Sequence, residues 1–112
     1  DRINGGKGDD MITGGDDADT LNGGSGDDAI WGGNGNDIFV YTGGDDYIGD
    51  FDGDRLRLDD ALWGGTALTN AEILAMATVV GNSTVFDFGG GNMLTLDFYT
   101  DIAGLDPVLD VF

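Results

Sequence analysis

Residues 5–49 read GGKGDDMIT, GGDDADTLN, GGSGDDAIW, GGNGNDIFV and YTGGDDYIG, which are five consecutive units of nine residues. A glycine pair opens each of the first four units, and the unit pattern is G-G-x-G-x-D-x-U-x, in which U is a large apolar residue. The sixth-place aspartates are Asp10, Asp19, Asp28, Asp37 and Asp46, and the same spacing extends back to Asp1. Because both the aspartates and the large apolar residues keep the nine-residue spacing without a break, the stretch is not interpreted as a disordered acidic linker.

The repeating unit has a physical logic. Consecutive glycines allow the positive φ angles of a tight turn, and the last three residues are short and extended, with U on one side. Three residues cannot form a stable strand alone, so the units must stack, each burying one apolar side chain. Two units of nine make one full coil, which places units n and n+2 side by side as parallel strands about 4.8 Å apart. Their aspartates then converge between successive coils.

The composition restricts the chemistry that the chain can perform. Its 112 residues include 22 acidic and 4 basic side chains, a formal charge of −18, with no cysteine and no histidine. Thiol chemistry, the usual zinc sites and histidine-based catalysis are therefore excluded, and so few basic residues make nucleic acid an unfavourable partner. Aspartate and backbone carbonyls favour Ca²⁺ over Mg²⁺, which needs a tighter octahedral geometry. No apolar run approaches the roughly 18 residues of a membrane span.

The charge divides the chain into residues 1–54 and residues 55–112. The first segment holds 14 aspartates against Arg2 and Lys7, so its net charge is −12. Without metal the stacked carboxylates would repel one another, and six U side chains form only a small core. We therefore expect this segment to be unfolded without Ca²⁺ and folded with it. The second segment is more apolar; a boundary near Asp54 and a fold that continues through it are both compatible with the sequence.

Residues 1–49 resemble the parallel β-roll of RTX proteins, whose Ca²⁺-binding repeat is this nonapeptide. The segment that follows is similar to the C-terminal secretion domain of serralysin-type metalloproteases and related exported proteins. The resemblance implies an all-β fold: a right-handed parallel β-roll with two nonapeptides per coil, then a β-rich C-terminal cap that contains one short helix. It also implies that each Ca²⁺ lies between turns n and n+2, held by backbone carbonyls and by both sixth-place aspartates.

Carried onto this sequence, the ligand pattern of the RTX family implies three complete Ca²⁺ sites. The first joins Gly6, Gly8 and Asp10 to Gly23, Ser25 and Asp28. The second joins Gly15, Asp17 and Asp19 to Gly32, Asn34 and Asp37. The third joins Gly24, Gly26 and Asp28 to Tyr41, Gly43 and Asp46. Partial sites formed by Asp1 with Asp19, and by Asp37 with Asp50, Asp52 and Asp54, would raise the total to five; the candidate set also includes the turn residues Gly14, Asp16, Gly33 and Gly35.

Two units depart from the repeat. Asp17 replaces the fourth-place glycine of the second unit, which should strain that turn or add a carboxylate to it. Tyr41 and Thr42 replace the glycine pair of the fifth unit, so the third site depends on a bulkier turn. We expect these two places to depart most from the regular geometry.

Other interpretations fit the acidic pattern less well. Residues 50–54 suggest an EF-hand loop, but Arg55 stands where that loop needs glycine and no helices are expected beside it. Pairs such as Asp9-Asp10 suggest the two carboxylates of a glycosidase, yet their repetition favours metal ligands over one active site. The outward positions carry no regular threonine or aromatic ladder, which disfavours ice binding and repetitive glycan binding. The chain is therefore predicted to be non-catalytic.

The second segment contains three further signals. Residues 54–59 alternate polar and apolar side chains, as a half-buried strand does. Thr69 and Glu72 form a capping box that predicts a helix to about Ala77, with Ile73, Leu74 and Ala77 toward the core. The final residues 109–112 (LDVF) resemble the terminus of type I secreted proteins and fit an ordinary strand equally well.

Residues 84–88 and 93–98 flank a glycine-rich turn and predict a β-hairpin. Phe86 and Phe88 should share a face opposite Leu94, Leu96 and Phe98. We expect these strands to extend the sheets and to cover the end of the solenoid, which would otherwise expose edges able to pair.

Together these patterns predict a secreted, extracellular Ca²⁺-binding module whose partners are calcium ions and the type I secretion machinery. Low cytosolic Ca²⁺ would leave the roll expanded for export, and the higher concentration outside would fold it and stabilise a larger exported protein. The absence of cysteine fits export without disulfides. Because Asp1 is a sixth-place residue, we expect the chain to be excised from something longer. The alternative is a polysaccharide- or surface-contacting accessory module of an extracellular enzyme, with Trp31 or Tyr47 in contact.

Overall fold

The computed structural model describes residues 2–51, 54–65 and 68–111. Within these ranges the chain consists mostly of short strands, with one α-helix and two 3-10 helices. The repeat region supplies six strands: β1 (Arg2–Asn4), β2 (Met11–Thr13), β3 (Thr20–Asn22), β4 (Ala29–Trp31), β5 (Ile38–Tyr41) and β6 (Asp45–Ile48). The prediction of a strand-based fold with one short α-helix is confirmed, and no helix of the described residues is long and apolar enough to cross a membrane.

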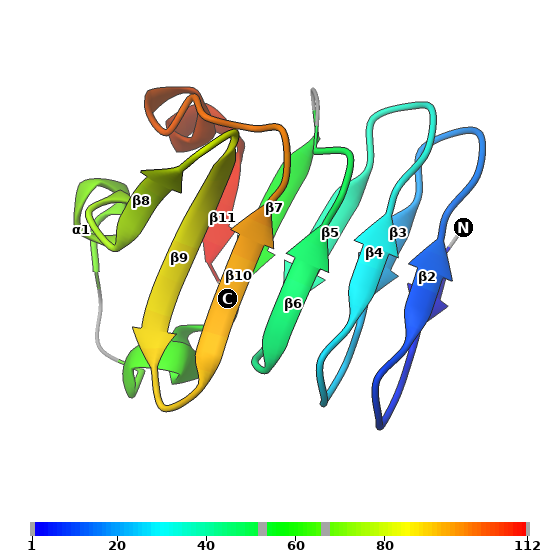
Figure 1. Ribbon diagram of the computed structural model, residues 1–112, viewed down its shortest axis with the longest axis horizontal. Helices are drawn as coiled ribbons and strands as arrows, with labels where there is room; N and C mark the ends of the chain where they lie inside the picture. Colours follow the sequence, from blue (N-terminus) through cyan, green and yellow to red (C-terminus); the bar gives the residue numbers. More distant parts are fainter. Residues whose placement is uncertain (1, 52–53, 66–67, 112) are drawn as a thin grey trace.

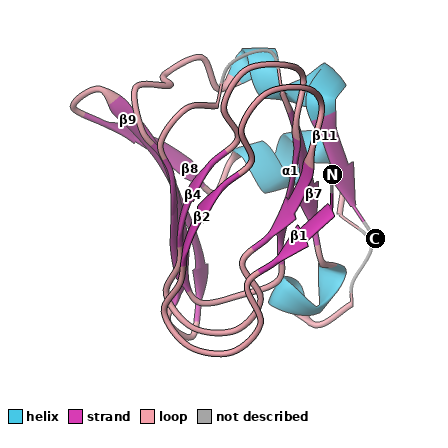
Figure 2. Cartoon of the chain, turned by 90° about the vertical axis from the view of Figure 1, so that its right-hand side faces the viewer, coloured by secondary structure: helices cyan, strands magenta, loops and turns pink. Residues whose placement is uncertain are grey.

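The strands of the repeat region, β1 to β6, alternate between two sheets, which the strands of the second segment extend (Figure 1). The later strands are β7 (Arg55–Leu58), β8 (Ala77–Val80), β9 (Ser83–Gly89), β10 (Asn92–Leu96) and β11 (Leu109–Val111). The five-stranded sheet has the order β1-β3-β5-β7-β11, and the six-stranded sheet has the order β2-β4-β6-β10-β9-β8. Neighbouring repeat strands are parallel, with Ile3 opposite Leu21 and Ile12 opposite Ile30. Each partner therefore lies two units further along the chain, which confirms the predicted pairing of units n and n+2. In Figure 2 the coils are seen nearly end-on, and the two sheets face each other.

The apolar U side chains of both sheets fill the space between them. Their burial follows from the alternation of a strand, since the middle residue points inward while its neighbours face outward. The fully or nearly fully buried members are Ile12, Leu21, Ile30, Phe39 and Ile48, each with at most 5% of its surface exposed. The core continues without a break into the second segment through Leu56, Leu58, Phe86, Leu94 and Leu96.

Strand β7 (Arg55–Leu58) carries the five-stranded sheet across the expected segment boundary. It lies parallel to β5, with Phe39 opposite Leu56, and on its other side it pairs with β11 (Leu109–Val111). Leu56 and Leu58 are buried while Arg55 is exposed, which confirms the predicted half-buried strand. The strand interpretation of the C-terminal residues is confirmed for Leu109–Val111.

The predicted hairpin is present as β9 (Ser83–Gly89) and β10 (Asn92–Leu96). β10 pairs in parallel with β6, so the hairpin extends the six-stranded sheet beyond the repeats, and β8 (Ala77–Val80) adds the last strand. Phe86 lies opposite Leu94 and both are fully buried. The expectation for Phe98 was wrong: β10 ends at Leu96, Phe98 adopts a positive φ of 56°, and 76% of its surface is exposed.

The short helix α1 (Asn70–Leu74) begins with the predicted capping box. The Glu72 amide donates to the Thr69 hydroxyl at 3.2 Å, and the Glu72 carboxylate accepts the Thr69 amide at 3.1 Å. Ile73 is buried, but the predicted extension to Ala77 was wrong, because Ala77 begins β8 and pairs with Phe86. Sheet pairing therefore ends the helix. The 3-10 helices η1 (Asp60–Trp63) and η2 (Ala103–Val108) were not predicted.

Candidate metal centre

The sixth-place aspartates form a ladder along the turns at the edges of the coils. In each step one carboxylate oxygen, Oδ1, accepts the backbone N–H of the aspartate one coil earlier. Asp28 accepts from Asp10 at 2.9 Å, Asp37 accepts from Asp19 at 2.9 Å, and Asp46 accepts from Asp28 at 3.0 Å. Each of these hydrogen bonds satisfies the Oδ1 atom of a carboxylate and thereby fixes the direction in which its Oδ2 atom points.

The second oxygen of four ladder carboxylates is buried without a hydrogen-bond donor. The atoms concerned among the described residues are the Oδ2 atoms of Asp10, Asp19, Asp28 and Asp37. A buried acceptor that lacks a partner costs about 1–3 kcal/mol, and more when it is charged. Four such atoms repeated at one place of the unit are therefore a feature that a bound cation would explain.

Burial makes the charged form of Asp28, Asp37 and Asp46 unfavourable. Burial is the largest influence on Asp28 and Asp37 and raises the pKa of both, and the neighbouring Asp10 and Asp19 charges raise it further. Burial raises the pKa of Asp46 to about 7, with further repulsion from Asp28 and Asp27. For all three carboxylates, the hydrogen bond accepted from a backbone N–H acts in the opposite direction and lowers the pKa. A divalent cation would remove the repulsion and replace the lost hydration.

Backbone carbonyls of the next coil converge on the same orphaned oxygens. Gly5 has no Cβ atom, and both the Oδ2 of Asp10 and the carbonyl oxygen of Gly23 lie 2.7 Å from the position that a Cβ on Gly5 would occupy. One unit later, the Oδ2 of Asp19 and the carbonyl oxygen of Gly32 lie 2.7 and 2.6 Å from the corresponding point on Gly14. Each place combines one carboxylate and one carbonyl from successive coils, which is the oxygen-only chemistry that Ca²⁺ prefers.

The turns that bring these oxygens together require glycine. Gly24 has a φ of 83°, and a side chain there would meet the Gly6 carbonyl oxygen at 2.2 Å. Gly26, with a φ of 100°, would meet the Gly8 carbonyl oxygen at 2.4 Å. The glycines therefore serve both the left-handed backbone and the close approach of successive coils.

Comparison with models of known protein families matches residues 1–29 and 13–48 to the RTX calcium-binding nonapeptide repeat, in four copies. Residues 1–48 carry RTX calcium-binding repeats. No curated protein matches the chain. The matched residues coincide with β1 to β6, so the RTX repeats are the part of the chain that holds the ladder and its orphaned oxygens.

A metal site in these repeats would need backbone carbonyls as well as carboxylates. No three acidic side chains of the described residues gather closely enough to hold a metal ion by themselves. Each predicted site instead draws two carboxylates from the ladder and its remaining oxygens from the turns. The first two predicted sites contain the convergent pairs described above, Asp10 with Gly23 and Asp19 with Gly32.

The second RTX unit keeps its turn although it lacks the fourth-place glycine. Asp17 occupies that place with a φ of 72°, the left-handed conformation that glycine adopts elsewhere in the repeat. Its neighbour Asp16 is exposed and accepts a 3.0 Å hydrogen bond from the side-chain amide of Asn34. The structure thus places both acids at the surface of the turn, away from the buried ladder.

The fifth RTX unit departs more strongly. Tyr41 is the last residue of β5 and is buried, with its hydroxyl donating to the Gly44 carbonyl at 2.6 Å. The Tyr41 carbonyl accepts the Asp59 amide at 3.2 Å, within the five-stranded sheet. The third predicted site therefore differs from the first two, because the equivalent oxygen is already hydrogen-bonded. Asn92 of the hairpin contacts this turn and accepts the Gly44 amide at 2.9 Å.

The predicted end sites have distinct arrangements. Asp54 continues the ladder by accepting the Asp37 amide at 2.8 Å, although it follows Asp37 by 17 residues rather than 18. Asp50 accepts the amides of both Gly32 and Gly33 at 2.8 Å, so its carboxylate caps a turn. Asp1 and Asp52 lie outside the described residues.

A second acidic row was not predicted as a structural feature. Asp9, Asp27 and Asp45 occupy the fifth place of alternate units and are exposed. Asp9 accepts the Asp27 amide at 2.9 Å, and Asp27 accepts the Asp45 amide at 3.0 Å. The Asp-Asp pairs in the sequence were the signal for this row. Only the coiled structure shows that the row follows one edge of the coils, because the units on the other edge have Ala18 and Asn36 at their fifth place.

Proposed function

We propose that the RTX repeats fold when Ca²⁺ binds between successive coils, and that this coupling supports the export and stability of a larger secreted protein. The observation that carries the proposal is the set of four buried carboxylate oxygens that have no donor, at the Oδ2 atoms of Asp10, Asp19, Asp28 and Asp37. Bound Ca²⁺ would supply the positive charge that the ladder lacks. The protein's own residues supply the oxygens, hold them through the amide bonds of the ladder, and exclude water by packing the U side chains.

The charge of the repeats supports a Ca²⁺-dependent fold. Residues 1–54 carry a net charge of −12, and the ladder stacks these acids at strand spacing. Five divalent ions would bring the segment close to neutrality. In a compartment with little free Ca²⁺ the segment would stay expanded and could pass through a type I channel, whereas extracellular Ca²⁺ would condense it. The C-terminal segment would then pair with the last coil through β7 and β10.

A Ca²⁺ titration of the purified chain tests the coupling. Far-ultraviolet circular dichroism should change from a disordered to a β-rich spectrum as Ca²⁺ is added, and Mg²⁺ at the same concentration should not replace it. Asp28→Asn keeps an acceptor for the Asp10 amide but removes one ligand charge, so it should shift the midpoint to higher Ca²⁺. Asp27→Asn is the matched control, because it makes the same charge change next door at an exposed residue.

A full β-rich spectrum in the presence of chelator would contradict the coupling. Equal midpoint shifts for Asp28→Asn and Asp27→Asn would show that net charge, rather than ligation, governs folding. The secretion role needs a separate test in which a passenger protein fused to this chain is exported through a type I system, with and without residues 109–112. Export that is indifferent to the whole chain would exclude that role.

Polysaccharide contact through Trp31 or Tyr47 stays the alternative function. These two rings pack edge to face on the outer face of the six-stranded sheet, with centroids 5.9 Å apart. The Tyr47 hydroxyl donates to Asp97, and the Trp31 indole covers Gly49. Packing on the sheet therefore accounts for both aromatic residues.

A further inference from the structure

Three of the four basic side chains of this acidic chain lie on one surface, the outer face of the five-stranded sheet. Arg2 stands in β1 at one edge of the repeats, and Arg55 and Arg57 stand in β7, where they alternate with the buried Leu56 and Leu58. The fourth cation, Lys7, is in a turn. The arginines are thus brought to one face by the coil, although more than fifty residues separate them in the sequence.

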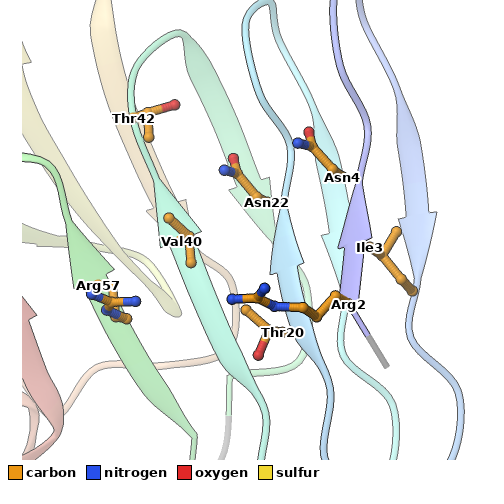
Figure 3. A pocket seen from close by; sticks show the side chains of 8 residues that line it. All are labelled: Arg2, Ile3, Asn4, Thr20, Asn22, Val40, Thr42 and Arg57. Carbon is orange, nitrogen blue, oxygen red and sulfur yellow. The ribbon is translucent and has the colours of Figure 1, made fainter.

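A groove of about 420 Å³ lies on this face (Figure 3). Its lining residues are Arg2, Ile3, Asn4, Thr20, Asn22, Val40, Thr42 and Arg57, none of which is acidic. Figure 3 shows the Arg2 guanidinium reaching along the sheet over Thr20, toward the side of the groove where Arg57 stands. Two like charges directed into one groove repel each other unless an anion lies between them.

The polar residues between the arginines present hydrogen-bond donors to the groove. The Asn4 side-chain oxygen accepts the Gly6 amide at 3.1 Å, and the Asn22 side-chain oxygen accepts the Gly24 amide at 2.9 Å. Each side-chain NH₂ is thereby turned away from the backbone, and Figure 3 shows both nitrogens directed along the groove. Thr20 and Thr42 add hydroxyl groups. The surface is therefore matched to a ligand that is anionic and rich in hydroxyl acceptors.

Arg57 is held in place by a carboxylate outside the groove. Its Nε donates to Asp110 of β11 at 3.2 Å, and both side chains are about half exposed. No ion pair to Arg2 is present among the described residues. Asp110 is therefore one anion that any ligand of Arg57 must share or displace.

We propose that this groove binds an acidic polysaccharide, with a uronate carboxylate between Arg2 and Arg57 and sugar hydroxyls on the asparagines and threonines. Planar guanidinium groups pair well with carboxylates, and amide and hydroxyl groups on a flat sheet suit sugar hydroxyls. The groove has no aromatic side chain on which a base could stack, which disfavours single-stranded nucleic acid.

The overall charge of −18 opposes any anionic ligand, and the ladder residue Asp19 directly precedes the groove residue Thr20. Ca²⁺ bound between the coils would neutralise much of this charge. The inference rests on the proposed function in this respect, because the groove exists only when β1, β3, β5 and β7 pair, and so requires the folded repeats.

The test is isothermal titration calorimetry of the Ca²⁺-folded chain with a short oligogalacturonate at fixed free Ca²⁺. Arg2→Gln and Arg57→Gln should each weaken binding about tenfold, as expected for the loss of one charge-assisted hydrogen bond. Arg55→Gln is the matched control, because it removes the same charge from the same face but does not line the groove, and it should change affinity less than about twofold. Asp110→Asn removes the competing carboxylate and should tighten binding.

Several outcomes would overturn the proposal. These are no binding by a chain whose circular dichroism shows the Ca²⁺-folded state, equal losses in all three arginine variants, or equal binding of a neutral galactan. Equal or tighter binding of polyglutamate would assign the groove to acidic peptides instead. A chain that stays unfolded with Ca²⁺ would reject the proposed function itself, so the two failures are distinguishable.

Discussion

Asp28 and Asp10, 18 residues apart, are joined by a 2.9 Å hydrogen bond from the Asp10 backbone amide to the Asp28 carboxylate. Asp28 in turn donates its own amide to Asp46 at 3.0 Å. Asp28 is therefore the middle member of a column that links three coils, and its remaining oxygen, Oδ2, is buried without a hydrogen-bond donor. This arrangement connects the charge of the sequence to the stacking of the coils.

Asp28→Ala should harm Ca²⁺-dependent folding more than Asp10→Ala. Asp28 belongs to two of the predicted sites, and its loss leaves the partly buried Asp10 amide without an acceptor, which alone costs about 1–3 kcal/mol for a fully buried group and less here. Asp10 belongs to one site, and no described amide donates to its side chain. The midpoint of folding in a Ca²⁺ titration, followed by circular dichroism, measures the difference. Equal shifts would count against the pairing of coils n and n+2 at the metal.

Asp17→Gly should stabilise the Ca²⁺-loaded chain by about 0.5–1 kcal/mol. Asp17 holds a left-handed φ of 72°, which glycine adopts without steric cost, although glycine also gains more freedom in the unfolded chain. Urea unfolding at saturating Ca²⁺ checks the sign. Ala18→Gly is the control, since Ala18 has no positive φ and should lose stability on the same change. Destabilisation by Asp17→Gly would instead indicate that the Asp17 carboxylate contributes to ion binding.

The Phe86→Ala variant should destabilise the second segment by about 3–5 kcal/mol, as the truncation of a fully buried phenylalanine does. Phe98→Ala is the matched control, because 76% of that side chain is exposed, and its effect should stay within about 0.5 kcal/mol. Thermal or urea unfolding in Ca²⁺ measures both. Similar losses in the two variants would mean that Phe98 is buried in solution.

Tyr47→Phe should reduce stability in Ca²⁺ at neutral pH, because the Tyr47 hydroxyl joins the last repeat strand to Asp97, which follows β10 and also accepts the Ser83 hydroxyl at 2.7 Å. The Tyr47 hydrogen bond lowers the pKa of Asp97, and the same bond, with burial, raises the pKa of Tyr47. The stability that the lowered pKa of Asp97 contributes is therefore fully present at pH values above its unfolded pKa, near 3.9. It is lost as the pH falls through the lower pKa of Asp97 in the folded chain.

The stability that the raised pKa of Tyr47 contributes depends on pH in the opposite direction. It is complete at pH values below the unfolded pKa of tyrosine, near 10, and is lost as the pH rises through the higher pKa of Tyr47 in the folded chain. The stability difference between the natural chain and Tyr47→Phe should therefore be constant near neutrality and shrink at high pH. A double-mutant cycle with Asp97→Asn isolates the pair. A difference that stays unchanged above the folded Tyr47 pKa would rule out the bond as its source.

The nine-residue repeat was sufficient to predict the coil and its ladder. Positive φ at Gly24, burial of Ile30 and the convergence of Asp10 with Asp28 all follow from local rules applied at a fixed spacing. The hairpin around residues 89–92 and the capping box of Thr69 and Glu72 are local as well. Such features are predictable because the residues that determine them lie within a few positions or within one period of each other.

Where strands stop and which distant residues meet were decided by the tertiary structure. Pairing of Ala77 with Phe86 ended the helix early, and the end of β10 turned Phe98 outward. Asp54 took the ladder position through a coil one residue shorter than the repeat. Arg2 and Arg57 came to line one groove only because their strands, β1 and β7, lie in one sheet with β3 and β5 between them. These outcomes depend on the competition between hydrogen-bonded pairing and packing across the whole chain, and no short stretch of sequence contains both partners.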